Sequence, residues 1–133
     1  LVLADGWYEW QKPEDPKQPR RPVRFSLPDG TPFCFAGLWT AGSCTIVTCA
    51  ANELARPIHD RMPVVLADPS GWDAWLDPTN ADVDALGQLL VPAPPRLITH
   101  HPVSTEVNNA RNQGPQLIDP VDPPPVNEQL GLV

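Results

Sequence analysis

Three residues that can exchange protons or hold charge occupy consecutive positions: His59, Asp60 and Arg61. Pro57 stands before this triplet and Pro63 after it. Because proline fixes its own φ and pushes the preceding residue towards an extended conformation, the triplet is predicted to lie on a short, rigid, non-helical connection. Functional side chains are often carried on loops that a rigid scaffold holds in place, so this connection is a candidate site.

Each of these side chains has a chemical role and a structural alternative. An imidazole titrates near neutral pH, so His59 is a candidate proton donor or acceptor; the alternative is that it caps a backbone carbonyl. Arg61 is a candidate for bidentate binding of a phosphate; the alternative is that it locks the loop through Asp60.

Glu9 is the second candidate for proton transfer. It lies in the aromatic segment Trp7-Tyr8-Glu9-Trp10, which is typical of a strand. Alternation along a strand puts Trp7 and Glu9 on one face and the other two residues on the opposite face. Large aromatic neighbours remove a carboxylate partly from water, which tends to raise its pKa and suits it to acid–base catalysis. The alternative is a carboxylate that faces solvent or pairs with an arginine.

Other polar residues have structural readings that compete with a functional one. His100 and His101 precede Pro102 in an expected strand, where alternation gives them opposite faces and a structural or exposed role. Asn108 lies in the polar segment 104–115. Its amide could bind phosphate or sugar oxygens, or hold the loop through local side-chain turns.

The cysteines are Cys34, Cys44 and Cys49. Their spacing offers no close pair of the kind that binds zinc, and the sequence shows no base within reach of a thiol. No metal or cofactor is therefore predicted. The odd number of cysteines favours a reducing, cytoplasmic compartment.

The composition is that of one acidic domain. The chain has 133 residues, 41 % of them hydrophobic, and a net charge of −7, which is enough apolar material for one core and excludes a non-specific nucleic-acid binder. Five of the nine cations lie close together: Lys12, Lys17, Arg20, Arg21 and Arg24. Any contact with nucleic acid must therefore come from a local patch. No apolar run approaches the roughly 18–20 residues of a membrane span.

The pattern of apolar residues and turn signals predicts many short strands and few helices. Strands are expected at 1–4, 7–10, 23–27, 33–39, 44–49, 64–66 and 96–103; helices at 68–76 and 80–90; and one or two helical turns at 50–55. The turn at 28–31 is expected to join 23–27 and 33–39 in a hairpin. The fold class is α+β, mainly β and barrel-like, with short helices. Residues 1–120 form the domain, followed by a proline-rich tail at 121–133 that is expected to be disordered.

The chain begins at Leu1 in an apolar, strand-like segment. Domains seldom begin within a strand, so we expect this chain to be the C-terminal portion of a longer protein, with a domain incomplete at its N-terminus.

Several motifs occur in an order that one family shares. They are Ala4-Asp5-Gly6-Trp7-Tyr8-Glu9-Trp10, Phe35-Ala36-Gly37-Leu38-Trp39, Thr48 with Ala51-Asn52, Ile58-His59-Asp60-Arg61-Met62-Pro63-Val64, Trp72-Trp75-Leu76, and Val103-Ser104-Thr105 with Val107-Asn108-Asn109. With them the chain closely resembles the SRAP family, the SOS-response-associated peptidase domain, over residues 1 to about 120.

The resemblance implies a DNA-damage response protein that recognises abasic sites in single-stranded DNA. In the family, removal of preceding residues exposes an N-terminal Cys, whose amine and thiol form a thiazolidine crosslink with the lesion aldehyde. The resemblance makes Glu9 and His59 catalytic. It places Arg61 in the DNA-binding groove and Thr48 near the active site.

Two further residues complete the predicted DNA-binding set. Trp7 offers an aromatic face for an unpaired base, and Asn108 an amide for the DNA backbone. The expected partner is single-stranded DNA that contains abasic sites, bound by a monomer without a cofactor. The protein is expected in the cytoplasm, associated with the nucleoid when bound to DNA, with no membrane partner.

One departure from the family limits this prediction. The family's N-terminal half is absent from the sequence, and with it the reactive cysteine. No internal cysteine can replace it, because none offers a free α-amine beside its thiol. The alternative is therefore a truncated, inactive remnant that binds single-stranded DNA weakly at most. A peptidase that acts on other proteins ranks last, because nothing supplies its nucleophile or metal.

Overall fold

The computed structural model describes residues 1–122; the predicted tail at 121–133 lies, from residue 123 on, outside the described residues. The strands are β1 (Val2–Ala4), β2 (Trp7–Gln11), β3 (Arg21–Ser26), β4 (Phe33–Phe35), β5 (Gly37–Thr40), β6 (Ser43–Ile46), β7 (Thr48–Ala50), β8 (Arg61–Pro63), β9 (Val65–Leu66) and β10 (Thr99–Pro102). The helices are α1 (Pro69–Leu76) and α2 (Val83–Leu89), with 3₁₀ turns η1 (Pro95–Leu97), η2 (Thr105–Asn108) and η3 (Pro115–Ile118). The class is mainly β with short helices, as the sequence predicts.

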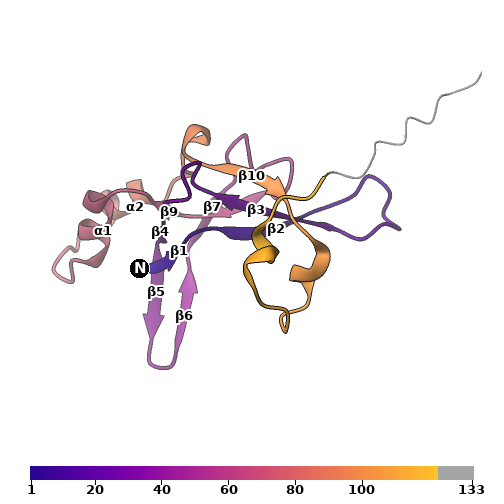
Figure 1. Ribbon diagram of the computed structural model, residues 1–133. Helices are drawn as coiled ribbons and strands as arrows, with labels where there is room; N and C mark the ends of the chain where they lie inside the picture. Colours follow the sequence, from indigo (N-terminus) through magenta and orange to yellow (C-terminus); the bar gives the residue numbers. More distant parts are fainter. Residues whose placement is uncertain (123–133) are drawn as a thin grey trace, which may run out of the picture.

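The strands form two three-stranded sheets and two two-stranded ladders, and all the pairings are antiparallel (Figure 1). The sheets have the strand orders β1-β4-β9 and β10-β3-β2, and the ladders are β5–β6 and β7–β8. The predicted hairpin of 23–27 with 33–39 is wrong, because β3 and β4 belong to different sheets. The turn at 28–31 instead carries the chain from one sheet to the other.

Three pairs of consecutive strands are each separated by a single residue, at one junction. Ala36 separates β4 from β5, Val47 separates β6 from β7, and Val64 separates β8 from β9. Their backbones close a ring of hydrogen bonds: Ala36 N donates to Val64 O (3.0 Å), Val64 N to Val47 O (2.9 Å), and Val47 N to Ala36 O (2.9 Å). Because a buried backbone group must be paired, this ring lets each strand change partners without losing a bond.

The ring corrects the expectation of unbroken strands at 33–39 and 44–49. Each of these two segments contributes to two ladders rather than one, whereas 64–66 contributes β9 alone. The ladders of the described residues do not close on one another, so the barrel stays a prediction.

An aromatic cluster lies beneath the two sheets. The Trp7 ring stacks on Phe25 at 4.9 Å and meets Phe33 and Phe35 edge-on at 6.2 and 5.9 Å. Phe25 and Phe33 are fully buried. Offset stacks and edge-to-face pairs of this kind are worth about 0.5–1.5 kcal/mol beyond their buried area. They fix β2 and β3 against the core.

The helices agree with the sequence in position and differ in burial. In α1, the Asp68 carboxylate caps the helix by accepting from Gly71 N at 3.1 Å. No residue of α2 is buried, and Val83 is 78 % exposed, so the predicted apolar face of 80–90 does not pack as a whole. The late strand at 96–103 is shorter than predicted, because Pro95–Leu97 form a 3₁₀ turn. No described helix is long and apolar enough to span a membrane.

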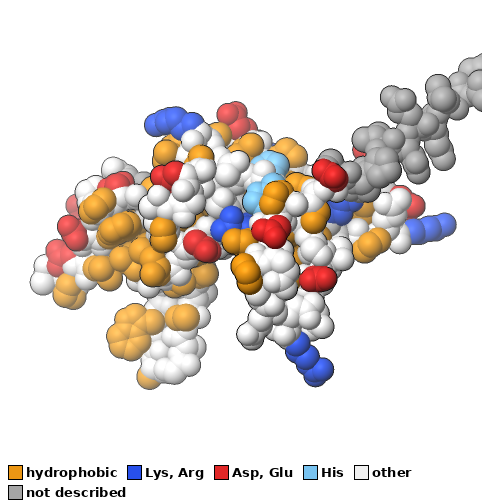
Figure 2. Space-filling view, viewed as in Figure 1, with side chains coloured by type: hydrophobic (Ala, Val, Ile, Leu, Met, Phe, Trp, Pro, Cys, Tyr) orange, Lys and Arg blue, Asp and Glu red, His pale blue; other side chains and the backbone are white. Residues whose placement is uncertain are grey.

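The ladder β5–β6 projects from the body of the molecule as a hairpin (Figure 1). Hydrophobic side chains on it face solvent (Figure 2). The same view shows Lys and Arg side chains scattered over this face, without a continuous basic field (Figure 2).

Candidate active site

Strand β2 places Glu9 on the same face of its sheet as Trp7 and Gln11. The register pairs Trp7 with Phe25, Glu9 with Val23, and Gln11 with Arg21. Because directly opposite residues share a face, this face runs from a buried aromatic end, past Glu9, to a polar end. The predicted alternation along 7–10 agrees with this register.

A buried asparagine shapes the segment that delivers His59. The side-chain amide of Asn52 donates to Ala93 O (2.7 Å), and its oxygen accepts from Leu54 N (3.1 Å) and Ala55 N (2.9 Å). His59 N donates to Ala55 O at 2.9 Å. The expected helical turns at 50–55 are hydrogen-bonded turns rather than a helix. Sequence reasoning gave Asn52 no site role, and its place in the shared motifs was the only signal.

Glu9 and His59 converge, although they are 50 positions apart in the sequence. His59 Nδ1 is 4.0 Å from Glu9 Oε2 and 3.4 Å from Asp60 Oδ1. The same Nδ1 lies 3.0 Å from Arg61 O and 3.2 Å from Arg61 N. Since Nδ1 can donate to the carbonyl in one tautomer and accept from the N–H in the other, the backbone holds this imidazole in either protonation pattern.

The pKa of Glu9 is raised above its ordinary value. Burial is the largest cause, because it penalises the charged form; the charge of Asp60 adds to it, while His59 and the Trp7 indole oppose it. The Glu9 side chain is 19 % exposed and that of His59 43 %. A carboxyl that keeps its proton more readily stands beside an open imidazole, which is an arrangement suited to proton transfer.

The Trp7 indole N–H is buried and, among the described residues, is the one buried side-chain nitrogen or oxygen without a hydrogen-bond partner. Trp7 nevertheless lowers the pKa of Glu9. The two observations agree if the N–H lies near the carboxylate without the geometry of a regular hydrogen bond. Trp7 therefore acts on the site through its edge, since its ring is packed against Phe25.

Arg61 is held by Thr48. Arg61 Nε donates to Thr48 Oγ1 (3.0 Å), and an Nη donates to the same oxygen (2.8 Å) and to Thr48 O (2.7 Å). Arg61 belongs to β8, which corrects the prediction that the whole triplet lies on a loop. Among the described residues, Asp60 pairs with His59 rather than with Arg61. The exposed guanidinium is thus fixed in direction at the end of a ladder.

The other two predicted DNA-binding residues differ in their relation to this pair. Trp7 lies beside Glu9, but its half-buried ring packs with its face on Phe25 in the aromatic cluster. Asn108 accepts from Trp10 Nε1 at 2.7 Å, and Trp10 points to the face of β2 opposite Glu9. DNA contacts by Trp7 and Asn108 stay predictions. Trp10, which is 36 % exposed beside Asn108, is not among the residues that the sequence predicts to bind DNA.

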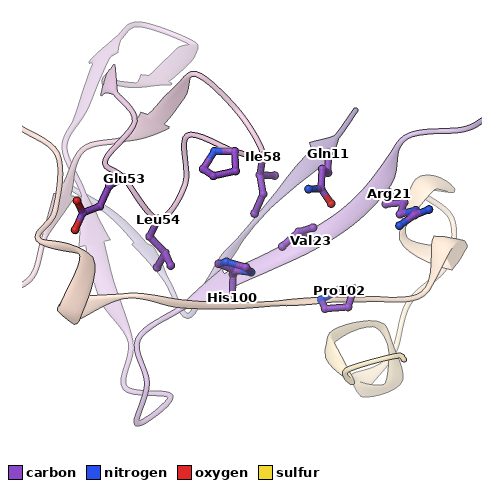
Figure 3. A pocket seen from close by; sticks show the side chains of 9 residues that line it. Gln11, Arg21, Val23, Glu53, Leu54, Ile58, His100 and Pro102 are labelled. Atoms are coloured by element: carbon purple, nitrogen blue, oxygen red, sulfur yellow. The ribbon is translucent and has the colours of Figure 1, made fainter. Parts of the chain in front are cut away.

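A cavity of about 410 Å³ lies on the sheet face that also carries Glu9, and Figure 3 shows the side chains that line it. It is lined by Gln11, Arg21, Val23, Glu53, Leu54, Pro57, Ile58, His100 and Pro102. It meets the site through Ile58, which precedes His59, and through Gln11, which shares the face of Glu9. Within residues 1–122 no group of three or more metal-ligating side chains is found.

Comparison with known proteins places the chain among relatives of one kind. The family described as "SOS response associated peptidase (SRAP)" matches residues 1–110. The chain is 39 % identical over 128 residues to "Abasic site processing protein YoqW" of Bacillus subtilis, covering 90 % of this chain and 56 % of that protein. It is 37 % identical over 134 residues to "Abasic site processing protein YedK" of Escherichia coli, covering 91 % and 57 %.

Solved structures agree with this likeness. A Bacteroides thetaiotaomicron protein superposes with a TM-score of 0.74 at 20 % identity over 90 % of this chain and 55 % of that one, which shows a shared fold. A phage-related protein of Bordetella bronchiseptica gives a TM-score of 0.59 at 33 % identity, over 77 % and 52 %. The chain spans about half the length of the curated bacterial relatives that it matches.

Proposed function

The chain belongs to the SOS response associated peptidase (SRAP) family, and on that premise we propose that it serves in the DNA-damage response at abasic sites in single-stranded DNA. The names of its relatives, abasic site processing proteins, support abasic sites as the substrate class. The observation that carries the proposal is the convergence of Glu9 and His59, which the family resemblance had named as the catalytic pair.

The proposed chemistry begins with the sugar of the lesion. An abasic deoxyribose is a cyclic hemiacetal; opening it removes a proton from the C1′ hydroxyl and returns one to the ring oxygen. Because its pKa is raised, the Glu9 carboxyl is suited to give a proton, and His59 is suited to take one. Opening leaves an aldehyde at C1′. Arg61, fixed by Thr48, is placed to hold a phosphate of the strand.

The covalent step needs an N-terminal cysteine with a free α-amine. The amine adds to the aldehyde and one water leaves, giving an imine; the thiol then adds to the imine carbon, closes a thiazolidine and passes its proton to nitrogen. Cys34, Cys44 and Cys49 are internal, so we propose this step, and the self-cleavage that exposes the cysteine, for a polypeptide in which that cysteine precedes Leu1.

The test is crosslinking of abasic single-stranded DNA without borohydride by such a polypeptide. Glu9→Gln should lower the rate by about 10²–10⁴-fold, the range for loss of a general acid–base group. Glu14→Gln, an exposed carboxylate of the 12–20 loop, is the matched control and should react at the wild-type rate. Wild-type rates in the Glu9 variant would contradict its assigned role.

The second candidate is an inactive remnant that retains the fold, lacks the covalent step and binds single-stranded DNA weakly at most. The net charge of −7 favours it, because an acidic chain repels phosphates. A mobility-shift titration with a single-stranded oligonucleotide distinguishes the two, since specific binding through phosphates weakens as salt rises. The absence of salt-sensitive binding at micromolar concentrations of the chain would favour the inactive remnant.

A further inference from the structure

We propose that the cavity beside Glu9 and His59 binds the nucleotide next to the lesion, with the phosphate on Arg21 and the base on the apolar floor. This assignment rests on the proposed function and adds a second contact for the same strand. It concerns the cavity lined by β2, β3, β10 and the turns that precede His59.

The position of the cavity fits a neighbour of the lesion. Gln11 and Arg21 form the next ladder pair on the face that carries Glu9 and Val23. A step of two residues along an antiparallel strand is about 6.8 Å, which is comparable with one nucleotide of an extended single strand. A strand with its damaged sugar at Glu9 would therefore bring an adjoining phosphate to Arg21.

The floor of the cavity suits a base. Val23, Ile58 and Pro102 supply apolar surface from three separate segments. The imidazole of His100, whose ring centroid lies 5.2 Å from that of Phe25, adds a flat edge. The Gln11 amide both donates and accepts hydrogen bonds, as a base edge requires. The volume of about 410 Å³ lies within the roughly 300–1,000 Å³ of small-ligand sites.

The charges of the cavity orient this ligand. Figure 3 shows Arg21 and Glu53 at opposite ends, so a phosphate is favoured at one end and repelled from the other. A base with an exocyclic amine can donate to the Glu53 carboxylate. The nucleotide therefore lies with its backbone towards Arg21 and its base towards Glu53.

A local basic patch continues from Arg21 into the loop between β2 and β3, which extends away from the body of the molecule (Figure 1). Lys12, Lys17 and Arg20 are exposed there, and within residues 1–122 none of them forms an ion pair. Arg24 differs, because it is nearly buried and pairs with Asp5 at 3.7 Å. Glu14 and Asp15 lie in the same loop, so residues 12–20 carry three cations and two carboxylates, a net charge of +1 in a chain of net charge −7.

The first experiment removes groups from the DNA and leaves the protein unchanged. Fluorescence anisotropy measures binding of the full chain to a single strand with one central tetrahydrofuran residue, a stable abasic analogue. Two further strands also lack the base on the 5′ or on the 3′ side. Because Arg21, the proposed phosphate contact, lies on one side of Glu9 along the ladder, we expect one deletion to weaken binding about tenfold and the other to have no effect.

The second experiment changes the protein. Arg21→Gln should weaken binding to the central-analogue strand and reduce the slope of log K against log salt by about 0.7, the value for one lost phosphate contact on a single strand. Arg96→Gln, an exposed arginine of η1 outside the cavity, is the control and should leave the slope unchanged.

The outcomes separate this inference from the proposed function. If the chain prefers the abasic strand over an intact one, and neither deletion nor Arg21→Gln weakens binding, the cavity assignment alone is overturned. The cavity then belongs to an occupant other than DNA. Equal losses from the two deletions also overturn the cavity assignment. Absence of any preference for the abasic strand overturns the proposed function, and the cavity assignment with it.

Discussion

The ladders β5–β6 and β7–β8 are alike in kind and adjacent in the chain, yet they lie in opposite surroundings. Each pairs two short antiparallel strands, and only Val47 separates β6 from β7. In β7–β8, Cys49 and Met62 face each other and are buried. In β5–β6, every residue of β6 is exposed and Trp39 is 85 % exposed.

The difference between the two ladders shows that packing against the core holds the site residues in place. A two-stranded ladder is only marginally stable in water by itself, so its rigidity comes from the core behind it. The ladder β7–β8 has that core, and it carries Thr48 and Arg61 and leads directly from His59. The ladder β5–β6 has no core behind it and carries no residue of the site. The predictions below test this contrast.

The largest effect is expected from removing the core behind β7–β8. Met62 is 1 % exposed, and Met62→Ala should lower the free energy of unfolding by about 2–5 kcal/mol. Leu38→Ala, at a position of β5 that is 57 % exposed, should change it by less than about 0.5 kcal/mol. Urea titrations of both variants measure the contrast; equal losses would show that the two ladders are supported alike.

The second-largest effect is expected from removing the side-chain hydrogen bonds that Thr48 accepts from Arg61. Thr48→Val keeps the shape of the side chain and removes the hydroxyl that accepts twice from the guanidinium. We expect a loss of about 1 kcal/mol and a several-fold weaker affinity for single-stranded DNA, because the cation keeps only its bond to the Thr48 backbone oxygen and is held less firmly. Thr45→Val makes the same change in β6 and should leave both quantities as they are. Unchanged DNA affinity in the Thr48→Val variant would show that the hydrogen bonds from Arg61 to the Thr48 hydroxyl do not contribute to DNA binding.

A smaller effect links the site to pH. A carboxyl whose pKa is raised in the folded state contributes stability that is complete below its unfolded value, here 4.5, and is lost as the pH rises through the raised value. Glu9→Gln cannot ionise, so the variant should melt a few degrees above wild type at pH 7, and the difference should vanish below pH 4.5. Calorimetry at both pH values checks the sign; a less stable variant at pH 7 would contradict the raised pKa.

The smallest effect is expected at the tip of the exposed hairpin. Trp39→Ala removes the largest exposed side chain of β5 and should change the free energy of unfolding of this chain by no more than about 0.5 kcal/mol. Thermal melts of the variant and wild type should overlap. A loss above 1 kcal/mol would mean that the hairpin is packed in solution, and the contrast with β7–β8 would then disappear.

Most elements could be predicted from the sequence, and their partners could not. The segments at 7–10 and 68–76 were placed within a residue or two, because alternation, an aspartate cap and proline positions are local signals. The hairpin expected across 28–31 failed because turn chemistry reports where a chain reverses and does not report which sheet the next strand joins. The α2 pattern failed because periodicity marks a face without showing whether anything covers it.

The features of the site can also be separated into those that the sequence predicted and those that only the structure showed. The sequence predicted Glu9 and His59 as a pair only through ordered motifs, and the structure then brought them within 4.0 Å. It also predicted the raised pKa of Glu9, since the aromatic neighbours are local. Three features could not be predicted from it: the hydrogen bonds between Thr48 and Arg61, the pairing of Asn108 with Trp10, and the stacking of the Trp7 ring on Phe25.

By itself, then, the sequence determined the family, the class of fold and the residue types that could move a proton. Only the tertiary structure decided that the strands break at Ala36, Val47 and Val64. It also decided that the turns before His59 bring this residue to Glu9, and that a cavity opens between these turns and β3. The physical reason is that strand pairing and burial depend on contacts between residues far apart in the chain, whereas propensity, capping and turn chemistry act over a few neighbours.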